Sequence, residues 1–371
     1  MRACTGADRK TLFFRYNLLF ILNKIGIVYN EEISDYDFGY GHPFRGTRFH
    51  EYMQLIVKKK ILENPNVVLI KNEPALKEDL LLAHSKEYIE EVEAQANLRL
   101  NISPDTPVTP RIVKAARYIV GGGLKAADLV KKGYMLVDSV GGGLHHAGRD
   151  YGGGFCVFND VAICTMALLR KFQYERVLIL DTDVHAGNGT MDIFSRDPRV
   201  LFIDLHQDPS TIYPGRGFLD EIGENGGKGY TVNVPLPPFA GDQEVDLALT
   251  RVFKPLVKQF EPQVIVRNGG SDPHFADRLG SLNMTYKGFH NIGATVREAA
   301  VDVEAPIINM SCSGYNPNTV AEGLYSILAG LMDIELDVEE VGNLNNVEPQ
   351  IEVVEKTIDK LAIIHQDYWT M

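Results

Sequence analysis

The sequence lacks the features that mark secreted, membrane-spanning and nucleic-acid-binding proteins. Its four cysteines form no CxxC pair and no closely spaced framework, which favours free thiols in a reducing cytoplasm. No stretch of about eighteen residues is uninterruptedly apolar, so no transmembrane helix and no membrane partner are expected. No block of lysine and arginine interrupts a chain of formal net charge −12, so direct binding to nucleic acid is not expected, whereas a basic substrate would be tolerated or mildly attracted.

Patterns that bind nucleotides are also missing. Glycine triplets recur at residues 121–123, 141–143 and 152–154, but none of them belongs to a GxGxxG sequence or a P-loop. The first triplet lies within a helical pattern, where it is expected to allow close packing. The other two bracket His145 and His146, where glycine lets the backbone approach a ligand closely.

Short apolar segments alternate with helical patterns from residue 25 onward. The expected strands are residues 25–29, 67–70, 177–180, 200–203, 264–267 and 307–310. This alternation, without a break in composition, predicts one three-layer α/β/α domain over residues 25–371 with a mostly parallel central sheet. Near its end, an acidic loop over residues 335–355 is expected to lead into an amphipathic helix over 358–368 that packs on the domain surface.

Residues 1–24 are interpreted as an N-terminal extension. Their apolar segment, residues 11–24, has some of the character of an export signal. Because Arg15 and Asn17 split the segment and no small-residue cleavage site follows it, a leading extension or helix is the preferred interpretation. A signal peptide is the alternative.

Residues 177–189 form an apolar segment that ends in two carboxylates and an imidazole. Because side chains alternate along a strand, Asp181, Asp183 and His185 should start on one face at the carboxyl end of the sheet, where open α/β sheets bind ligands. Oxygen and nitrogen donors of this kind suit Zn²⁺ or a neighbouring divalent ion. A capping or turn aspartate beside a core histidine is the alternative.

Three further motifs carry polar side chains. His145 and His146 could share acid–base work, but they could equally be two loop histidines or two metal ligands. Asp272, which follows the strand over residues 264–267, could complete a three-ligand set with the donors of the central motif or could cap a helix. Tyr315 follows the last strand, where its hydroxyl could donate to a developing oxyanion or its ring could simply pack.

Taken together, these motifs resemble the zinc-dependent histone deacetylase superfamily, which includes bacterial and archaeal acetoin-utilization and acetylpolyamine deacetylases. The resemblance covers residues 25–330 and implies the arginase/deacetylase-like version of the α/β/α fold. The motifs that carry it, in the order of the family, are Gly41-His42-Pro43 with Arg48, Glu78-Asp79-Leu80 with His84-Ser85, His145-His146-Ala147, Gly154-Phe155-Cys156-Val157-Phe158-Asn159-Asp160, Asp181-x-Asp183-x-His185-x-Gly187-Asn188-Gly189, Tyr213-Pro214-Gly215, Asp272, and Gly314-Tyr315-Asn316.

The resemblance implies two cations. One Zn²⁺ per chain would be bound by Asp183, His185 and Asp272, where it would polarise a water molecule and the substrate carbonyl. A monovalent cation, expected to be K⁺, would lie behind the site. Its ligands would be backbone oxygens of Asp181, Asp183 and His185 and the side chain of Asp204.

The resemblance also implies the catalytic roles. His146 would act as general base and then as general acid toward the leaving amine, with Asn188 as the residue that orients it. His145 would be its electrostatic partner, oriented by Asp181. Tyr315 would hydrogen-bond the tetrahedral oxyanion.

The expected substrate is an acetyl-lysine side chain in a peptide or protein, or a small acetylated amine such as an acetylpolyamine. By the resemblance, Gly154, Phe155 and Tyr213 flank a narrow tunnel, and Leu279 also lines it. Asp105, in a proline-rich loop, lies where the family has an acid that grips the substrate backbone. The sequence does not indicate the acyl length or the oligomeric state.

Three departures from the pattern of the family affect these expectations. Asn188 stands where many members have an aspartate, and a neutral partner should leave His146 less basic. Ala186 replaces a second histidine that many members carry, which does not touch the expected chemistry. Residues 311–313 (Ser-Cys-Ser) replace a run of glycines, which is expected to alter the approach of Tyr315 to the metal.

Two other functions are weighed against the deacetylase. Arginase-like ureohydrolases share the architecture but use two metals and a denser set of Asp and His ligands than this chain offers. A non-catalytic acyl-lysine binding module would be expected to lack a metal ligand or the tyrosine, and this chain keeps both.

Overall fold

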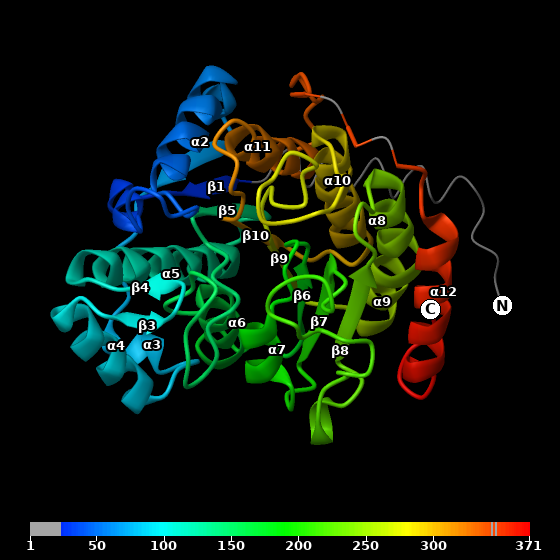
Figure 1. Cartoon of the computed structure of the whole chain (residues 1–371), viewed down its shortest axis with the longest axis horizontal. Coiled ribbons are helices and arrows are strands. Elements are labelled where there is room, and N and C mark those ends of the chain that lie inside the picture. The colour runs from blue at the N-terminus through cyan, green and yellow to red at the C-terminus, as the bar shows by residue number, and fades with distance from the viewer. Residues whose placement is uncertain (1–23, 343, 346) are drawn as a thin grey trace.

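The computed structural model describes residues 24–342, 344–345 and 347–371. Over these residues an eight-stranded sheet lies between two layers of helices (Figure 1). The strand order is β2-β1-β5-β10-β9-β6-β7-β8, and every pair of neighbouring strands is parallel. The predicted three-layer α/β/α fold is therefore confirmed. The predicted extension, apart from Lys24, lies outside the described residues.

The strands of the sheet are short and, except for β2 at one edge, largely buried. They are β1 (Ile25–Val28), β2 (Val67–Ile70), β5 (Leu136–Val140), β6 (Val177–Asp181), β7 (Val200–Gln207), β8 (Thr231–Leu236), β9 (Val264–Asn268) and β10 (Ile307–Ser311). Parallel strands covered on both faces favour continuous apolar sequences, which is how most of them were predicted. A small antiparallel hairpin, β3 (Asn101–Ser103) and β4 (Thr106–Pro107), lies outside this sheet.

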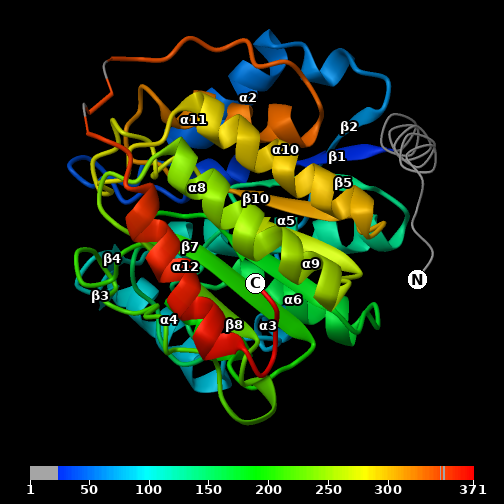
Figure 2. The same ribbon diagram turned by 90° about the vertical axis from the view of Figure 1, so that its right-hand side faces the viewer.

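The helices divide between the two faces of the sheet (Figure 2). One face carries α2 (Thr47–Lys58), α8 (Asp242–Ala248), α9 (Lys254–Phe260), α10 (Tyr286–Asp302) and α11 (Val320–Leu331). The other face carries α5 (Pro110–Lys131) and α6 (Asp160–Arg170), with α3 (Lys77–Leu80) and α4 (Lys86–Leu98) outside them. Helix α7 (Asn188–Phe194) follows β6. No helix in the described part of the chain combines the length and apolar character needed to cross a membrane.

Helix α5 illustrates how local sequence sets an element. Thr109 accepts a hydrogen bond from the N–H of Ile112, and Pro110 occupies the first turn, where its missing N–H is not needed. The predicted packing glycines lie on its buried side. A Cβ at Gly121 would lie only 1.9 Å from the carbonyl oxygen of Glu73, so a larger residue could not fit there.

The C-terminal helix begins earlier than predicted. The acidic loop was predicted to reach residue 355 and the helix to begin at 358, but α12 spans Ile351–His365. Its buried side chains are those of Val354, Ile358, Leu361 and His365. They recur at helical spacing, so Val354 adds one turn to the apolar stripe that holds the helix against α8 and β8.

Candidate metal and acid–base site

Polar side chains gather where β6 and β9 end. The two strands are parallel neighbours, and Asp181 at the end of β6 pairs with Asn268 at the end of β9. The loops that follow carry Asp183 and His185 after β6, and Asp272 after β9. The structure thus brings together the residues that the sequence analysis placed at this edge of the sheet.

The local geometry after β6 differs from the predicted strand alternation. Because the strand ends at Asp181, the next two donors lie in a loop. Asp181 Oδ1 accepts a hydrogen bond from the N–H of Asp183 over 3.1 Å, and Asp183 Oδ1 accepts one from the N–H of His185 over 2.9 Å. These side-chain-to-backbone turns, rather than a pleated strand, set the directions of the three side chains.

Asp183, His185 and Asp272 form a buried triad with the donor set of a metal site. One ligand atom of each lies within 4.8 Å of the others. His185 Nδ1 lies 3.1 Å from Asp183 Oδ1 and 3.4 Å from Asp272 Oδ2. Asp272 Oδ2 is buried without a hydrogen-bond partner among the described residues. A buried carboxylate oxygen that lacks a hydrogen bond and lies next to two other potential metal ligands fits a cation. Two carboxylates with one imidazole are a ligand set that fits Zn²⁺.

The triad places two buried carboxylates next to one imidazole. Burial and the neighbouring Asp183 raise the pKa of Asp272 to about 7. Burial lowers the pKa of His185, but the two carboxylates outweigh this effect and raise it to about 9. The carboxylates therefore compete for the charge of one imidazolium, and a divalent cation would satisfy both.

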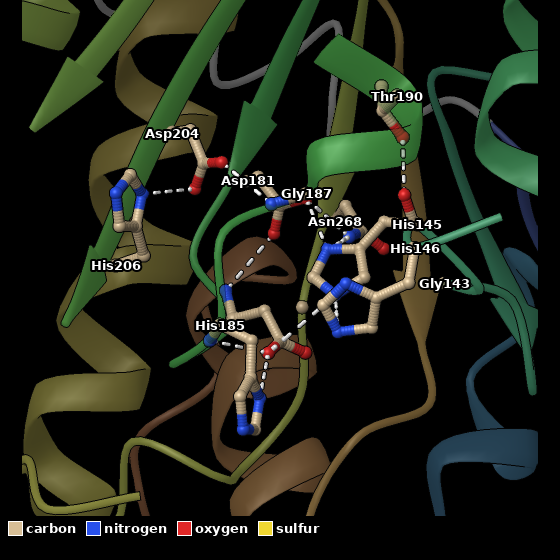
Figure 3. A network of polar contacts seen from close by, with 12 residues as sticks. Gly143, His145, His146, Asp181, His185, Gly187, Thr190, Asp204, His206 and Asn268 are labelled. Atoms are coloured by element: carbon tan, nitrogen blue, oxygen red, sulfur yellow. Dashed lines mark hydrogen bonds and ion pairs between the residues drawn. The ribbon is translucent and has the colours of Figure 1, made fainter. Parts of the chain in front are cut away.

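His145 and His146 lie side by side near His185 (Figure 3). His145 Nδ1 is 2.8 Å from Asp181 Oδ2, and His146 Nδ1 is 2.8 Å from Asn188 Oδ1. The structure therefore pairs each histidine with the residue that was predicted to orient it. One partner is a carboxylate and the other is a neutral amide.

These different partners separate the pKa values of the two histidines. Burial lowers the pKa of His145, but Asp181 and Asp183 outweigh it and raise the pKa to about 10. Burial, together with the positive charges of His145 and His185, lowers the pKa of His146 well below its ordinary value. At neutral pH His145 is cationic and His146 is neutral, which leaves His146 a lone pair that can take a proton.

Tyr315 lies close to the triad with its hydroxyl protonated. Its ring centroid is 6.4 Å from that of His185, and only 8% of the residue is exposed. Burial raises the pKa of Tyr315, so its hydroxyl is a hydrogen-bond donor. Asp277 holds its backbone, because one carboxylate oxygen accepts from the N–H of Tyr315 over 2.7 Å and the other accepts from the N–H of Leu279 over 2.9 Å.

Aromatic rings stand beside these groups. The ring centroid of Tyr213 is 4.9 Å from that of His146, and the ring centroid of Phe155 is 5.6 Å from that of Tyr315. Gly154 has a φ of +55°, and a Cβ there would lie 2.4 Å from Cδ2 of His146. Only glycine therefore fits next to the imidazole at this position.

Asp105 contacts Gly154, and hydrogen bonds from protein groups already occupy its carboxylate. The N–H of Gly154 donates to both oxygens of Asp105, over 3.3 and 3.2 Å. The hydroxyls of Ser103 and Thr106 donate to Oδ1 over 2.5 and 2.9 Å. The structure gives Asp105 a part in holding Gly154 in place, and its contact with substrate stays a prediction.

Asp204, predicted to bind a monovalent cation, is buried beside the end of β6. It pairs across the strands with Asp181. Its Oδ2 accepts a hydrogen bond from the N–H of Gly187 over 2.8 Å, and its Oδ1 lies 3.0 Å from Nδ1 of His206 (Figure 3). Protein groups already contact both oxygens, so the K⁺ site stays a prediction.

Two polar residues to which the sequence analysis gives no role contact the site. Asn268 Nδ2 donates to Asp181 Oδ2 over 2.8 Å, and Ser313 Oγ donates to Asp272 Oδ1 over 2.8 Å. A signal for Asn268 was present, since it directly follows the predicted strand over residues 264–267, as Asp181 follows the predicted strand over 177–180. Ser313 belongs to the Ser-Cys-Ser run that departs from the expected glycines, and its hydroxyl orients a carboxylate of the triad.

The known sequences that resemble this chain include those of a protein family and of two named proteins. The sequence model of a family described as "Histone deacetylase domain" matches residues 42–331. The chain is 35% identical over 311 residues to a protein of Archaeoglobus fulgidus named "Probable deacetylase", which covers 82% of each chain. It is 32% identical over 306 residues to "Acetoin utilization protein AcuC" of Staphylococcus aureus, with 80% of this chain and 78% of that one covered.

A solved structure supports the fold independently. The structure described as "Crystal Structure of HDA15 HD domain" superimposes with a TM-score of 0.81 and covers 94% of this chain and 96% of that one. At 24% sequence identity this likeness bears on the fold alone.

Proposed function

The chain belongs to the histone deacetylase family, and from this premise we propose that it is a zinc-dependent hydrolase that removes acetyl or short acyl groups from lysine side chains. The resemblance inferred from the sequence motifs is confirmed, and a deacetylase hydrolyses an amide bond. The observation that supports the narrower proposal is the buried triad of Asp183, His185 and Asp272 next to the neutral His146.

The triad would hold one Zn²⁺ per chain. When bound, the ion would supply a Lewis acid that lowers the pKa of a water molecule and polarises the acyl carbonyl. A structural K⁺ near Asp181 and Asp204 is also part of the proposal. Its support is the position of the buried Asp204 carboxylate beside the strand end that carries Asp181.

The side chains around the triad would carry the proton and the developing charge. His146 would take a proton from the attacking water on Nε2 and deliver it to the amide nitrogen as the C–N bond breaks, so the products are a carboxylic acid and an amine. His145, kept cationic by Asp181, would stabilise negative charge during both steps. Tyr315 would donate a hydrogen bond from its hydroxyl to the former carbonyl oxygen. Asn188 would accept a hydrogen bond from the Nδ1–H of His146 throughout.

The walls beside the site suit a slender aliphatic chain. Phe155 and Tyr213 present ring surfaces, and Gly154 leaves space next to His146. The side chain of acetyl-lysine has this shape, and acetylated polyamines have it too and are the alternative substrates. The net charge of −12 favours the approach of a basic peptide that carries acetyl-lysine, or of a polyamine through its free amino groups.

The proposal is tested by loading the purified chain with Zn²⁺ and measuring acetate release from acetyl-lysine peptides, longer acyl-lysines and acetylpolyamines side by side. We expect one equivalent of metal per chain and turnover on at least one acetylated amine. Two tightly bound Mn²⁺ ions with release of urea from a guanidino substrate would instead identify a ureohydrolase. Stoichiometric binding of acyl-lysine without any acetate release would identify a non-catalytic binding module.

Asp272→Asn is expected to weaken Zn²⁺ binding by more than about a hundredfold, since removal of groups that merely orient metal ligands costs about 10- to 100-fold. The amide keeps the volume of the side chain and can still accept from Ser313, but it removes a charge from the triad. Zinc retained after dialysis against a competing chelator measures the effect. Asp246→Asn, on α8, is the matched control, and equal zinc retention by both variants would exclude Asp272 from the metal site.

Asn188→Asp is expected to make His146 more basic. The carboxylate would stand 2.8 Å from Nδ1, where it would stabilise the imidazolium form. Because the base must be neutral to accept a proton, the acid limb of the kcat/KM profile should move to higher pH by about one pH unit or more. Asn225→Asp, at an exposed turn, adds the same charge remotely. An unchanged acid limb in Asn188→Asp would show that residue 188 does not set the basicity of His146.

A further inference from the structure

Hydrogen bonds continue from His146 through Asn188 to the protein surface. Asn188 Nδ2 donates to the hydroxyl oxygen of Tyr151 over 3.2 Å, and that hydroxyl donates to Asp192 Oδ2 over 2.6 Å. Arg216 donates to the other oxygen of Asp192 over 3.2 Å. A continuous series of hydrogen bonds therefore links the buried imidazole of His146 to the exposed ion pair of Asp192 and Arg216.

The direction of each hydrogen bond in this series can be assigned by starting from Asp192, its last acceptor. A carboxylate only accepts hydrogen bonds, so the hydroxyl of Tyr151 must donate its hydrogen bond to Asp192. The hydroxyl oxygen of Tyr151 can then only accept a hydrogen bond from Asn188. Asn188 must then turn its NH₂ group toward Tyr151 and its carbonyl oxygen toward His146. Since a carbonyl oxygen also only accepts, Nδ1 of His146 carries the proton and Nε2 keeps its lone pair.

We propose that Tyr151 and Asp192 are positioning residues that hold the amide of Asn188 in one orientation and so keep His146 in the tautomer with an unprotonated Nε2, the nitrogen that faces Nε2 of His145 over 3.2 Å. An aspartate at position 188 would need no such help, because its two oxygens are equivalent acceptors. An asparagine has two different ends, and a flipped amide would present a donor to Nδ1 and favour the unproductive tautomer. The inference rests on the proposed role of His146 as general base.

The turn that presents Tyr151 is itself held from the core. The N–H of Gly148 donates to the carbonyl oxygen of Tyr151 over 2.9 Å, and a Cβ on Gly148 would lie 2.3 Å from Cε1 of the tyrosine ring. His84 Nε2 accepts from the N–H of Asn159 over 2.9 Å, so its Nδ1 carries the proton and donates to the carbonyl oxygen of Gly148 over 2.8 Å. Burial lowers the pKa of His84 to about 4, which keeps it in this neutral form. His84, which belongs to one of the sequence motifs, therefore holds the backbone of Gly148 in place.

Tyr151→Phe in the zinc-loaded full chain removes the hydroxyl and keeps the ring packed on Gly148. We expect kcat on an acetyl-lysine peptide to fall by about fivefold to tenfold, the size expected for one lost buried hydrogen bond, with KM and bound zinc unchanged. Asp192→Ala should act in the same direction, because the freed hydroxyl can then donate to Asn188 and invert the amide. Since both variants act through one contact, the double variant should lose no more than the worse single variant. Tyr118→Phe, on α5, is the matched control.

The deciding measurement is the tautomer itself. In protein labelled with ¹⁵N-histidine, long-range ¹H–¹⁵N correlation distinguishes Nδ1–H from Nε2–H, and the His146 signals are identified by their loss in His146→Ala. We expect Nδ1–H in the wild-type chain, and Nε2–H or a mixture in Tyr151→Phe. Retention of a pure Nδ1–H form in Tyr151→Phe would overturn the inference. This readout needs no turnover, so it decides the positioning role even if the proposed deacetylation fails its own test.

Discussion

Replacing His146 with alanine is expected to lower kcat by about a thousandfold, because general acid–base catalysis contributes about 10²–10⁴-fold and this residue would serve both steps. The physical reason is that His146 is neutral and keeps a lone pair on Nε2, whereas its neighbour is held cationic by Asp181. Bound zinc should not change, since His146 is not among the residues of the triad. Turnover of an acetyl-lysine peptide, together with metal analysis, measures both quantities.

The control for this variant is His50→Ala, on the exposed side of α2, which removes an imidazole without touching the site. Its turnover should match that of the wild-type chain. If His146→Ala retained a rate close to wild type, the proton acceptor would have to be sought elsewhere. His145, whose Nε2 lies 3.2 Å from that of His146, would not replace it, because Asp181 and Asp183 hold His145 in the cationic form.

The adjacent histidines show how one sequence motif yields two chemical roles. Two neighbouring imidazoles cannot both be cationic without strong repulsion, and a partner for each decides which one holds the charge. The carboxylate of Asp181 holds it on His145, and the amide of Asn188 leaves His146 neutral. The dipeptide alone left these assignments open, because its partners come from β6 and the first turn of α7, which are distant in the sequence.

The predicted strands were those with continuous apolar sequence. Strand β5 was missed because Asp138 and Ser139 interrupt its apolar residues. Asp138 is tolerated in the core because Tyr52, Asn309 and Ser311 donate hydrogen bonds to it over 2.7 to 2.9 Å. These donors are supplied by α2 and β10, so no local pattern could reveal that a charged side chain would be satisfied there. Strand β8, which contains Asn233 and Pro235, escaped prediction for a similar reason.

The site was predictable where its residues lie close in sequence or follow recognisable strands. The turn from Asp181 to His185 brings three side chains together by local hydrogen bonds, and the strand ahead of Asp272 is plainly apolar. Tyr151 and Asp192 were not predictable, since their contact depends on how a glycine-rich turn lies against α7. The sequence predicted that Asn188 orients His146, and only the structure showed which contact fixes the orientation of its amide group.

Tyr315→Phe carries the second large expected effect. Loss of a single donor to an oxyanion costs about 10²–10³-fold in kcat, and burial keeps the hydroxyl of Tyr315 protonated for this purpose. The phenyl ring should keep its place, because it packs against Phe155 and Phe44 at centroid distances of 5.6 and 6.4 Å. Arg48 further supports it, with its guanidinium carbon 5.2 Å from the ring centroid.

The Ser-Cys-Ser run before Tyr315 was expected to alter the approach of the tyrosine to the metal, and this variant also tests that expectation. Arg48 donates to the carbonyl oxygen of Cys312, and Asp277 accepts from the N–H of Tyr315, so the backbone on both sides of Gly314 is held without a glycine run. We therefore expect Tyr315→Phe to keep its zinc and its thermal stability while kcat falls. Tyr174→Phe, at a half-buried position in the loop between α6 and β6, serves as the control for hydroxyl removal. Full turnover by Tyr315→Phe would assign the tyrosine to packing alone and leave the oxyanion to His145 and the cation.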